Sequence, residues 1–339
     1  MPIYTITPRL LSITEQIAAL RERIQAAAVE LAWVPALQKD SRSRNVHAST
    51  AIEGNPLTLE QVRMLEEGRT LAATDDRSKR EVLNYFAGLR YIENNASKKQ
   101  IHHEHVFTLH RILADGVMDQ GESGRYRSIF VRVGSHIPPA PDEVSGLMME
   151  LLEWWNKDAP AVSPVISSAI LHHRFETIHP FADGNGRTGR ALALWELYRR
   201  GFDTHHIFSI DEYYWEDRPA YYAALEAVHR HGNDLTEWLA YSAEGLRRTL
   251  ENVWLRIQAF QPESNKKVIL RPRQEQLLRL LADHGSMPPA EIWAALEISR
   301  QGAMDLLNPL LDAGLVERTG GKKTGRYGLK TKISGPFDQ

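Results

Sequence analysis

Residues 179–190 read HPFADGNGRTGR, and the interpretation of the whole chain starts from them. Apolar residues keep helical spacing over about 162–178 before them and over about 187–200 after them, which predicts a tight loop that opens into a helix. The N-terminus of a helix exposes unpaired backbone N–H groups and a partial positive charge, both of which suit a polyphosphate. Gly184 and Gly186 let the backbone come close to such a ligand.

The charged side chains of this loop supply the other parts of a phosphate-transfer site. Arg187 and Arg190 are three residues apart, so they fall on one face of the helix and can hold phosphate oxygens. Asp183 offers a hard oxygen ligand for Mg²⁺, and His179 is a base whose ordinary pKa lies near neutrality. Apart from Thr188 the loop contains no nucleophile of its own, so we expect a substrate hydroxyl to attack.

Two other nucleotide-binding motifs share letters with this loop. Gly184, Gly186 and Gly189 have the spacing of the dinucleotide-binding fingerprint, but that motif needs a preceding strand and a βαβ unit. Here a predicted helix precedes the loop, which disfavours that interpretation. The sequence contains no GxxxxGK[ST] motif, so a Walker-type NTPase is not supported either.

The loop matches the signature HxFx(D/E)GNGRxxR at every defined position, and it therefore resembles the Fic family. The resemblance covers roughly residues 30–255, and the segment from Gly124 to Pro139 is similar to the family's flap. It implies a mainly α fold, a Fic-type helical core with a short β-hairpin flap. The implied function is a protein adenylyltransferase, which moves AMP from Mg-ATP to a Tyr, Ser or Thr hydroxyl. Members that phosphorylate instead carry a Lys where this chain has Gly186.

The resemblance also implies a role for each residue of the loop. His179 would deprotonate the target hydroxyl for in-line attack on the α-phosphate, and Asp183 would bind the Mg²⁺ that bridges the phosphates. The side chains of Arg187 and Arg190 would hold the β- and γ-phosphates. The phosphate oxygens would lie in a cradle formed by the backbone of Gly184, Asn185 and Gly186, with help from the Asn185 side chain.

Two further binding regions are implied by resemblance. The flap, about 127–137, would pair with an extended target segment by strand addition, through Ser128, Ile129, Phe130, Val131 and Val133. The adenine pocket would be lined by Tyr222, Leu225 and His229, although an aromatic core stripe explains the first two residues equally well.

Residues 49–54 read STAIEG and are similar to the family's inhibitory motif, (S/T)xxxE(G/N), with Ser49 and Glu53 at its defined positions. A carboxylate paired with Arg190 would neutralise the group that holds the γ-phosphate and would occupy its space. The resemblance therefore implies autoinhibition by Glu53. In some relatives the same glutamate positions water to remove AMP, and de-AMPylation stays a secondary hypothesis here.

We predict three regions along the chain. Residues 1–100 form a helical region with an inhibitory helix at about 36–54, followed by a short helix with a capping box made by Thr58 and Gln61. Residues 101–260 form the catalytic core, and 261–339 comprise a polar linker and a winged helix-turn-helix domain of three short helices and a hairpin.

Charge argues weakly for DNA binding by the C-terminal region. The predicted recognition helix, about 299–313, carries Arg300 as its only cation, and Pro309 is expected to interrupt it. We therefore favour a protein-docking or dimerisation module over a DNA-binding one, and a homodimer stays open. The rival function for the whole chain is a nucleotide-sensing transcriptional regulator that acts through this winged helix. Transfer of another nucleotide or phosphate-containing group by the same loop is a third alternative.

Composition agrees with an ordinary soluble protein. The 339 residues are 42% hydrophobic and 25% charged, and the net charge of −2 gives no overall basic field for nucleic acid or membrane. The absence of cysteine excludes disulfides, thiolate zinc sites and cysteine nucleophiles, and it suits a reducing compartment. No signal peptide or membrane-spanning stretch is evident, so we expect a cytoplasmic protein whose partner is a target protein or the chain itself.

Overall fold

The computed structural model describes residues 2–28, 34–71, 74–202, 206–259, 272–312, 314–321 and 325–330. The chain divides into two compact units. The first unit contains Met1–Arg21 and Asp40–Val253, and the second contains Glu22–Lys39 and Trp254–Gln339. The predicted linker at 261–267 lies outside the described residues.

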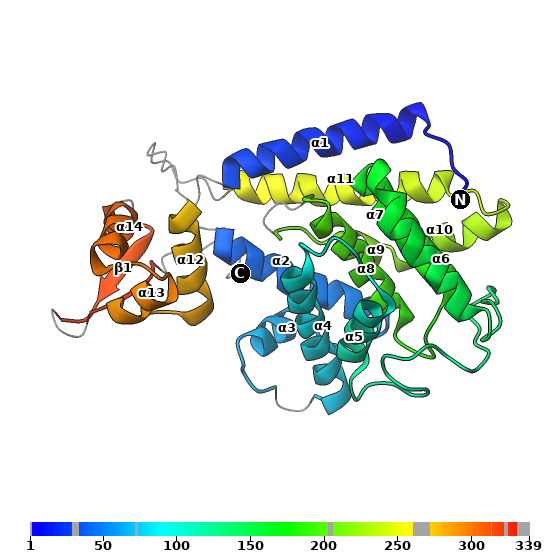
Figure 1. Cartoon of the computed structure of the whole chain (residues 1–339), viewed down its shortest axis with the longest axis horizontal. Helices are drawn as coiled ribbons and strands as arrows, with labels where there is room; N and C mark the ends of the chain where they lie inside the picture. The colour runs from blue at the N-terminus through cyan, green and yellow to red at the C-terminus, as the bar shows by residue number, and fades with distance from the viewer. Residues whose placement is uncertain are drawn as a thin grey trace. The chain divides into compact units, whose positions relative to one another are not determined.

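The described part of the chain is mainly helical (Figure 1). In chain order its elements are α1 (Pro8–Ala28), α2 (Val34–Ile52), α3 (Leu59–Glu66), α4 (Asp76–Asn95), α5 (His103–Ala114), α6 (Val144–Lys157), the 3₁₀ turn η1 (Ala159–Ala161), α7 (Pro164–Ile178), α8 (Asn185–Arg199), α9 (Ile210–Glu216), α10 (Arg218–Arg230), α11 (Thr236–Ala259), α12 (Pro272–His284), α13 (Pro289–Ala295), α14 (Arg300–Asp312), β1 (Val316–Thr319) and β2 (Arg326–Leu329).

The centre of the first unit is the pair of helices α7 and α8, which pack against each other and are joined by residues 179–184. Both helices are buried on nearly all sides rather than along one stripe, as expected for helices inside a core. Phe175 and Trp195, each fully buried, belong to this centre. The loop of the site is therefore held at both ends by the most buried elements of the fold.

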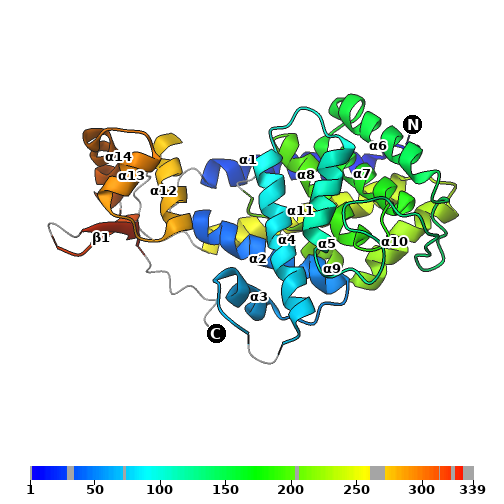
Figure 2. The ribbon, with the colours of Figure 1, turned by 60° about the horizontal axis from the view of Figure 1, so that its bottom comes forward.

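Other helices cover this pair. In Figures 1 and 2, α4 and α5 run side by side, and both contact α8, while α6 packs on α7. Helix α3 follows α2 closely in the chain and begins at the predicted capping box, in which Thr58 and Gln61 each bond the other's backbone N–H. These helices bring the N-terminal segment with Ser49 and Glu53 up to α8.

Asp217 caps α10, because its side chain accepts a hydrogen bond from the Ala220 N–H. Two local details differ from the sequence-based expectation. The flap contains one antiparallel bridge, Val133 to His136, in place of two paired strands. Helix α14 continues through Pro309 instead of stopping there.

The second unit has the helices and hairpin predicted for a winged helix. Strands β1 and β2 pair antiparallel, with Val316 opposite Leu329, and they form the regular sheet of the described residues. An apolar core joins them to α12, α13 and α14 through residues such as Leu277, Ile292 and Leu307. The hairpin therefore belongs to the same core as the three helices.

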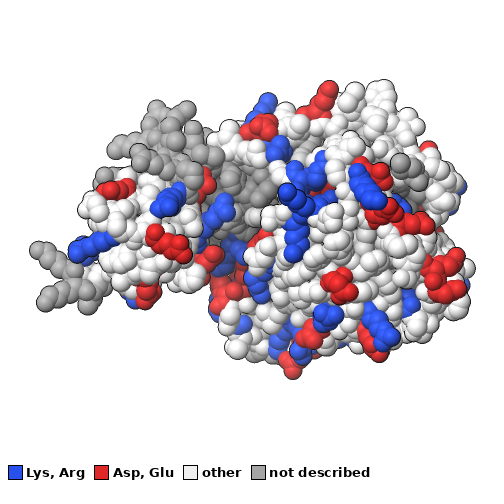
Figure 3. Space-filling view, in the orientation of Figure 1, with Lys and Arg blue, Asp and Glu red and all other residues white. Residues whose placement is uncertain are grey.

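The surface carries charges of both signs. On the face of the first unit that Figure 3 shows, basic and acidic side chains are interspersed, in keeping with the small net charge. Within the described ranges, no helix has both the length and the apolar character that crossing a membrane requires.

Candidate active site

The loop between α7 and α8 is shaped by two residues in the left-handed region. His179 ends α7 with φ 48° and ψ 61°, and Gly184 caps α8 with φ 75°. Glycine adopts this conformation freely, whereas a histidine does so at a cost that the surrounding structure must offset. The chain thus places an imidazole at the C-terminal end of one helix and a glycine at the N-terminal end of the next.

The Asn185 side chain holds the loop closed. Its Oδ1 accepts a hydrogen bond from the Phe181 N–H at 2.9 Å, and its Nδ2 donates to the Phe181 carbonyl at 2.8 Å. Asn185 is 2% exposed, so this side chain holds the turn together, and its contribution to phosphate binding stays a prediction. The backbone N–H groups at the start of α8 are left for an anion.

His110, which the sequence reasoning missed, supports the same loop from α5. Its ring stacks on the fully buried Phe181 with centroids 3.6 Å apart. Its Nδ1 accepts from the Gly124 N–H at 2.8 Å, so its Nε2–H donates to the Asp183 carbonyl at 2.9 Å. Burial lowers the pKa of His110 to about 4, which keeps this ring neutral.

Arg127 ties the flap to the loop. Its backbone N–H donates to the Pro180 carbonyl and its Nε donates to the His179 carbonyl, at 2.9 and 2.8 Å. The same guanidinium reaches the carbonyls of Ile129 and Pro139. Arg127 is 4% exposed and thereby fixes where the flap starts relative to the catalytic loop.

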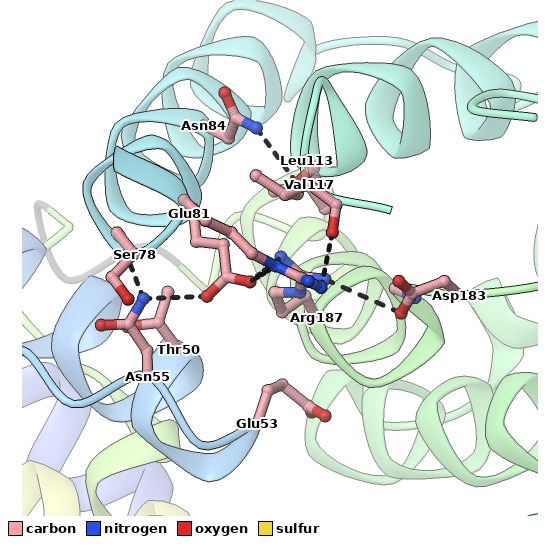
Figure 4. A network of polar contacts seen from close by, with 12 residues as sticks. Thr50, Glu53, Asn55, Ser78, Glu81, Asn84, Leu113, Val117, Asp183 and Arg187 are labelled. Atoms are coloured by element: carbon pink, nitrogen blue, oxygen red, sulfur yellow. Dashed lines mark hydrogen bonds and ion pairs between the residues drawn. The ribbon is translucent and has the colours of Figure 1, made fainter. Parts of the chain in front are cut away.

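Arg187 has the features expected of an anion ligand. It is 4% exposed, and its Nε and Nη1 have no hydrogen-bond partner among the described residues. Two carboxylates flank it at longer range, Glu81 at 3.9 Å and Asp183 at 4.0 Å (Figure 4). Because unpaired buried guanidinium groups are costly, this arrangement is suited to receive a charged oxygen acceptor.

Arg190 is already paired. Its Nε donates to the Ser49 hydroxyl at 2.8 Å, and its Nη2 donates to the Ser49 carbonyl at 2.8 Å and to Oε1 of Glu53 at 2.7 Å. The Glu53 carboxylate also lies against Gly186, where an added Cβ would overlap it. The two residues of the predicted inhibitory motif thus contact the predicted γ-phosphate ligand directly.

A second carboxylate lies near Arg190, in a segment, 211–215, whose composition suggests a place near the site but no particular role. Asp211 of α9 lies 3.8 Å from the Arg190 Nε and accepts a hydrogen bond from the Tyr85 hydroxyl at 3.2 Å. Burial raises the pKa of Asp211, although Arg190 and the hydroxyl groups around it oppose the shift. Because Asp211 lies 21 positions after Arg190, the loop motif contains no signal for it.

His179 and its neighbour Glu176 share a nearly buried environment. Burial lowers the pKa of His179 to about 4, an effect that the main chain of Glu176 only partly offsets. Burial raises the pKa of Glu176 to about 8, although Arg190 opposes this and the charge of Glu53 adds to it. The imidazole is therefore neutral at pH 7.

A cavity of about 380 Å³ connects these groups. Its walls include His179, Glu176, Gly186, Arg190 and Glu53, together with the predicted adenine-pocket residues Tyr222, Leu225 and His229. The flap closes part of it, because the ring of His136 stacks on that of His229 with centroids 4.3 Å apart. The catalytic loop, the inhibitory glutamate and the predicted base-binding residues thus face one space.

Asp183 fits the role of a Mg²⁺ ligand. Its side chain is 28% exposed, and its two oxygens accept from the N–H groups of Gly184 and Asp119 at 2.6 and 3.2 Å. No group of three or more His, Asp or Glu side chains able to hold a metal occurs in the part of the chain that the structure describes. A lone carboxylate suits Mg²⁺, which usually keeps several waters and takes further oxygens from substrate phosphates.

The flap exposes apolar side chains beside this cavity. The exposed fractions are 76% for Phe130, 40% for Ile129 and 37% for Val133. Ser128 is also exposed, and Val131 is half-buried. An exposed cluster of large apolar residues next to a polar site is typical of an interaction surface.

Comparison with known proteins agrees with this geometry. A protein adenylyltransferase Fic of Drosophila persimilis is 30% identical over 272 residues, which is 78% of this chain and 51% of the relative. The protein adenylyltransferase fic-1 of Caenorhabditis briggsae is 34% identical over 205 residues, 59% of this chain and 38% of the relative. The chain spans about half the length of the curated relatives it matches first.

Solved structures give the same result. A Fic family protein from Desulfovibrio desulfuricans G20 is 29% identical, with a TM-score of 0.68 over 99% of this chain and 100% of the other. Fic-1 of C. elegans, residues 134–508, is 25% identical, with a TM-score of 0.64 over 74% of each chain. The sequence models of the Fic/DOC family and the MarR family match residues 100–197 and 270–326. The chain therefore carries a Fic/DOC family domain followed by a MarR-type winged-helix domain.

Proposed function

We propose that this chain transfers AMP from ATP to a hydroxyl group of a protein, and that Glu53 restrains the reaction. The observation that carries the proposal is Arg187 at the N-terminus of α8, whose buried Nε and Nη1 make no hydrogen bond among the described residues and face carboxylates only at ion-pair distance. A site built in this way is ready for an anion, and a neutral imidazole lies on the same loop. The relatives named protein adenylyltransferase support AMP as the group transferred.

The side chains suggest a simple course for the reaction. The target hydroxyl gives its proton to His179 while its oxygen attacks the α-phosphorus, and the bond to the β-phosphate oxygen breaks, so that pyrophosphate leaves with the electron pair. Arg187 and Arg190 would hold the β- and γ-phosphates and stabilise the charge that develops on the leaving group. Mg²⁺, held by Asp183, would neutralise phosphate charge when bound.

The restraint follows from the contacts of Arg190. While Glu53 occupies Arg190 and lies against Gly186, the γ-phosphate cannot use either group. A charge-assisted hydrogen bond of this kind contributes about 1.5–3 kcal/mol, and the one-third exposure of the Glu53 side chain places this contact at the low end. Restraint of about tenfold is the size that such a contact can supply.

The target is proposed to dock on the flap. An extended segment could add to the edge at 129–133, where Ile129, Phe130 and Val133 expose apolar side chains. Self-modification needs no such partner. Loss of labelling of an added target protein in Phe130→Ala, with self-labelling kept, would support this surface, and equal loss of both would refute it.

The test of the activity compares variants in Mg²⁺ with ATP that is radiolabelled at the α- or γ-phosphate. We expect Glu53→Gly to increase protein labelling from α-labelled ATP about tenfold or more, to add one AMP by mass, and to give no labelling from γ-labelled ATP. The double variant with His179→Ala should lose the label. Glu67→Gly is a matched control, because Glu67 also follows a helix but pairs with Arg69.

Two results would contradict the proposal. Labelling that persists without His179 would remove the base, and labelling from γ-labelled ATP would indicate phosphorylation. Removal of AMP is tested on protein that is already labelled: release that needs both Glu53 and His179 would extend the function to de-AMPylation.

The MarR-type region favours a second candidate, a nucleotide-sensing regulator that binds DNA. In that case ATP would bind without turnover, and the affinity of the full chain for duplex DNA would change on addition of Mg-ATP. Fluorescence anisotropy with a labelled duplex, in Glu53→Gly and in its His179→Ala double variant, separates the two functions. Only the enzyme depends on His179.

A further inference from the structure

The catalytic loop has a neighbour that the proposed reaction has not used. Glu176 lies one turn before His179 on α7, and its Oε2 is 3.7 Å from Nδ1 of the imidazole. Both side chains are less than one fifth exposed, at 14% and 17%. Oε1 of Glu176 and Nδ1 of His179 are both buried without a well-formed hydrogen bond among the described residues, although the main chain of Glu176 also lies close enough to the ring to raise its pKa. Two unsatisfied polar groups thus lie side by side within the cavity that contains the reacting groups.

The packing of α7 on α8 gives this carboxyl group its place. Gly189 of α8 faces Glu176, and a Cβ there would overlap Oε1. Phe175 would also be touched, at 3.1 Å. The glycine therefore leaves a space that the carboxyl group fills, beside the helix that provides Arg187 and Arg190. A buried carboxyl group is costly to keep, and it is usually explained by a partner or by chemistry.

We propose that Glu176 is a positioning residue for His179, with its carboxylate accepting a hydrogen bond from Nδ1–H so that Nε2 stays free to take the proton of the target hydroxyl. The inference rests on the proposed function and deepens it. The proton moves from the hydroxyl to Nε2, while the Nδ1 proton stays on the ring, and the carboxylate stabilises the imidazolium. The 3.7 Å between the two atoms exceeds hydrogen-bond distance, so the pairing requires one side chain to move toward the other.

The surrounding charges set when this pairing forms. Arg190, Glu53 and Tyr221 surround Glu176, while Arg127, Glu53 and His136 act on His179. Burial raises the pKa of Glu176 to about 8, and the charge of Glu53 contributes to that shift. Below this pH the neutral acid donates to Nδ1, which leaves the ring proton on Nε2 and blocks the base. Above it the carboxylate accepts from Nδ1–H, so the transfer rate rises as the pH rises.

The experiment measures AMP transfer at saturating Mg-ATP from pH 6 to 9 in four proteins: Glu53→Gly alone, and Glu53→Gly combined with Glu176→Gln, Glu176→Asp or Glu196→Gln. Glu196 is the matched control, a fully buried glutamate of α8 that pairs with Trp155 and Ser167. We expect Glu176→Gln to lower the plateau rate about ten- to a hundredfold and to remove the rise with pH, without changing ATP affinity. Glu176→Asp should restore part of the plateau rate and part of its rise with pH. Glu196→Gln should keep the pH profile of Glu53→Gly.

A second measurement keeps the test independent of turnover. The ¹⁵N signals of the His179 ring, assigned by their loss in His179→Ala, report the tautomer and its pKa. In Glu53→Gly at pH 8 we expect the His179 ring to carry its proton on Nδ1. When Glu176→Gln is added, we expect a mixture of the two His179 tautomers and a lower His179 pKa. An unchanged rate profile together with an unchanged tautomer in Glu176→Gln would overturn the inference. If His179→Ala still transfers AMP while the tautomer depends on Glu176, the proposed function fails and the positioning stands.

Discussion

Arg190 connects the proposed activity with its restraint. The guanidinium is 2% exposed and donates to Ser49 and Glu53, while Asp211 lies within 4 Å. Since an unpaired buried guanidinium would be costly, Arg190 needs an acceptor in both states of the enzyme. Asp211 and the Ser49 backbone can hold it in place when Glu53 leaves and a phosphate arrives.

The first prediction concerns the charge of Glu53. Removal of its carboxylate from water opposes ionisation, but the charge and hydrogen bond of Arg190 outweigh this, so the pKa of Glu53 lies below its ordinary value of 4.5. A lowered pKa in the folded protein means that the contact stabilises fully above pH 4.5 and is lost as the pH falls through the folded value. We expect Glu53→Gln to cost about 1 kcal/mol at pH 7, a figure discounted for the exposed third of the side chain.

Urea unfolding of wild type and Glu53→Gln between pH 3.5 and 7 measures this difference. It should stay constant from pH 7 to 5 and shrink below pH 4.5. Glu60→Gln serves as the control, because the side chain of Glu60 is two-thirds exposed. A difference that grows as the pH falls would show that Glu53 is not paired with a cation in the folded protein.

The residues of the loop could be predicted from the sequence because the motif itself contains their chemistry. The partners of that loop could not. Glu176 acquires its neighbour only when α7 packs on α8, and Asp211 reaches Arg190 from a separate helix. The loop-closing role of Asn185 was not predicted either: its side chain bonds the Phe181 N–H and carbonyl, because an amide can satisfy both backbone groups of a tight turn.

At the scale of elements, the turn after α2 fixes the inhibitory segment. Asn55, 8% exposed, donates to the Ser78 carbonyl at 3.0 Å and to Glu81 at 2.8 Å, and it accepts from the Leu57 N–H at 3.1 Å (Figure 4). The segment that carries Glu53 is thereby tied to α4. Glu81 also lies 3.9 Å from Arg187, so the carboxylate that holds Asn55 is next to the proposed phosphate ligand.

The second prediction follows from this tie. Asn55→Ala should destabilise the protein by about 1–3 kcal/mol, because buried partners lose their hydrogen bonds. It should also raise self-labelling several-fold, because Glu53 is held less firmly on Arg190. Asn84→Ala is the matched control: Asn84 also lies on α4 and bonds the Asp115 carbonyl at 2.8 Å, but it makes no contact with the segment after α2.

Thermal unfolding and labelling from α-labelled ATP give both readouts for these two variants. An Asn55→Ala protein that is destabilised but labels itself no faster than wild type would mean that the tie supports the fold and leaves the restraint untouched.

Most helices could be predicted from the spacing of apolar residues in the sequence and from the residues that cap or end a helix. Long amphipathic helices such as α4 and α5, and the capping box at Thr58, have local signals. The flap alternates like a strand, yet it forms a single bridge at Val133, because Arg127 fixes its start by side-chain bonds to loop carbonyls. Pro309 lies inside α14, which shows that packing can outweigh the lost backbone bond.

At the scale of the whole molecule, every residue of the proposed site belongs to the first unit, from Ser49 to His229. The second unit has its own apolar core of α12, α13, α14 and the hairpin. Its described helices α13 and α14 carry Glu291 and Asp305 beside Arg300, a balance that disfavours strong phosphate binding. The proposed chemistry thus needs no residue from the core of the second unit.

This separation leads to the third prediction, which uses thermal unfolding of the full chain. Mg-ATP at one fixed concentration, a hundred times its dissociation constant for wild type, should stabilise the first unit of wild type by about 2.7 kcal/mol, roughly 5–10 °C for a domain of this size. The shift should be larger in Glu53→Gly than in wild type, because Arg190 is then available to the γ-phosphate. Arg187→Ala should abolish most of this shift.

The matched control, Arg69→Ala, removes an exposed arginine that pairs with Glu67 and should leave the shift intact. Since the second unit contains none of these residues, its own transition should stay where it is without nucleotide. Equal shifts in wild type and Glu53→Gly would mean that Glu53 does not compete with the nucleotide for Arg190.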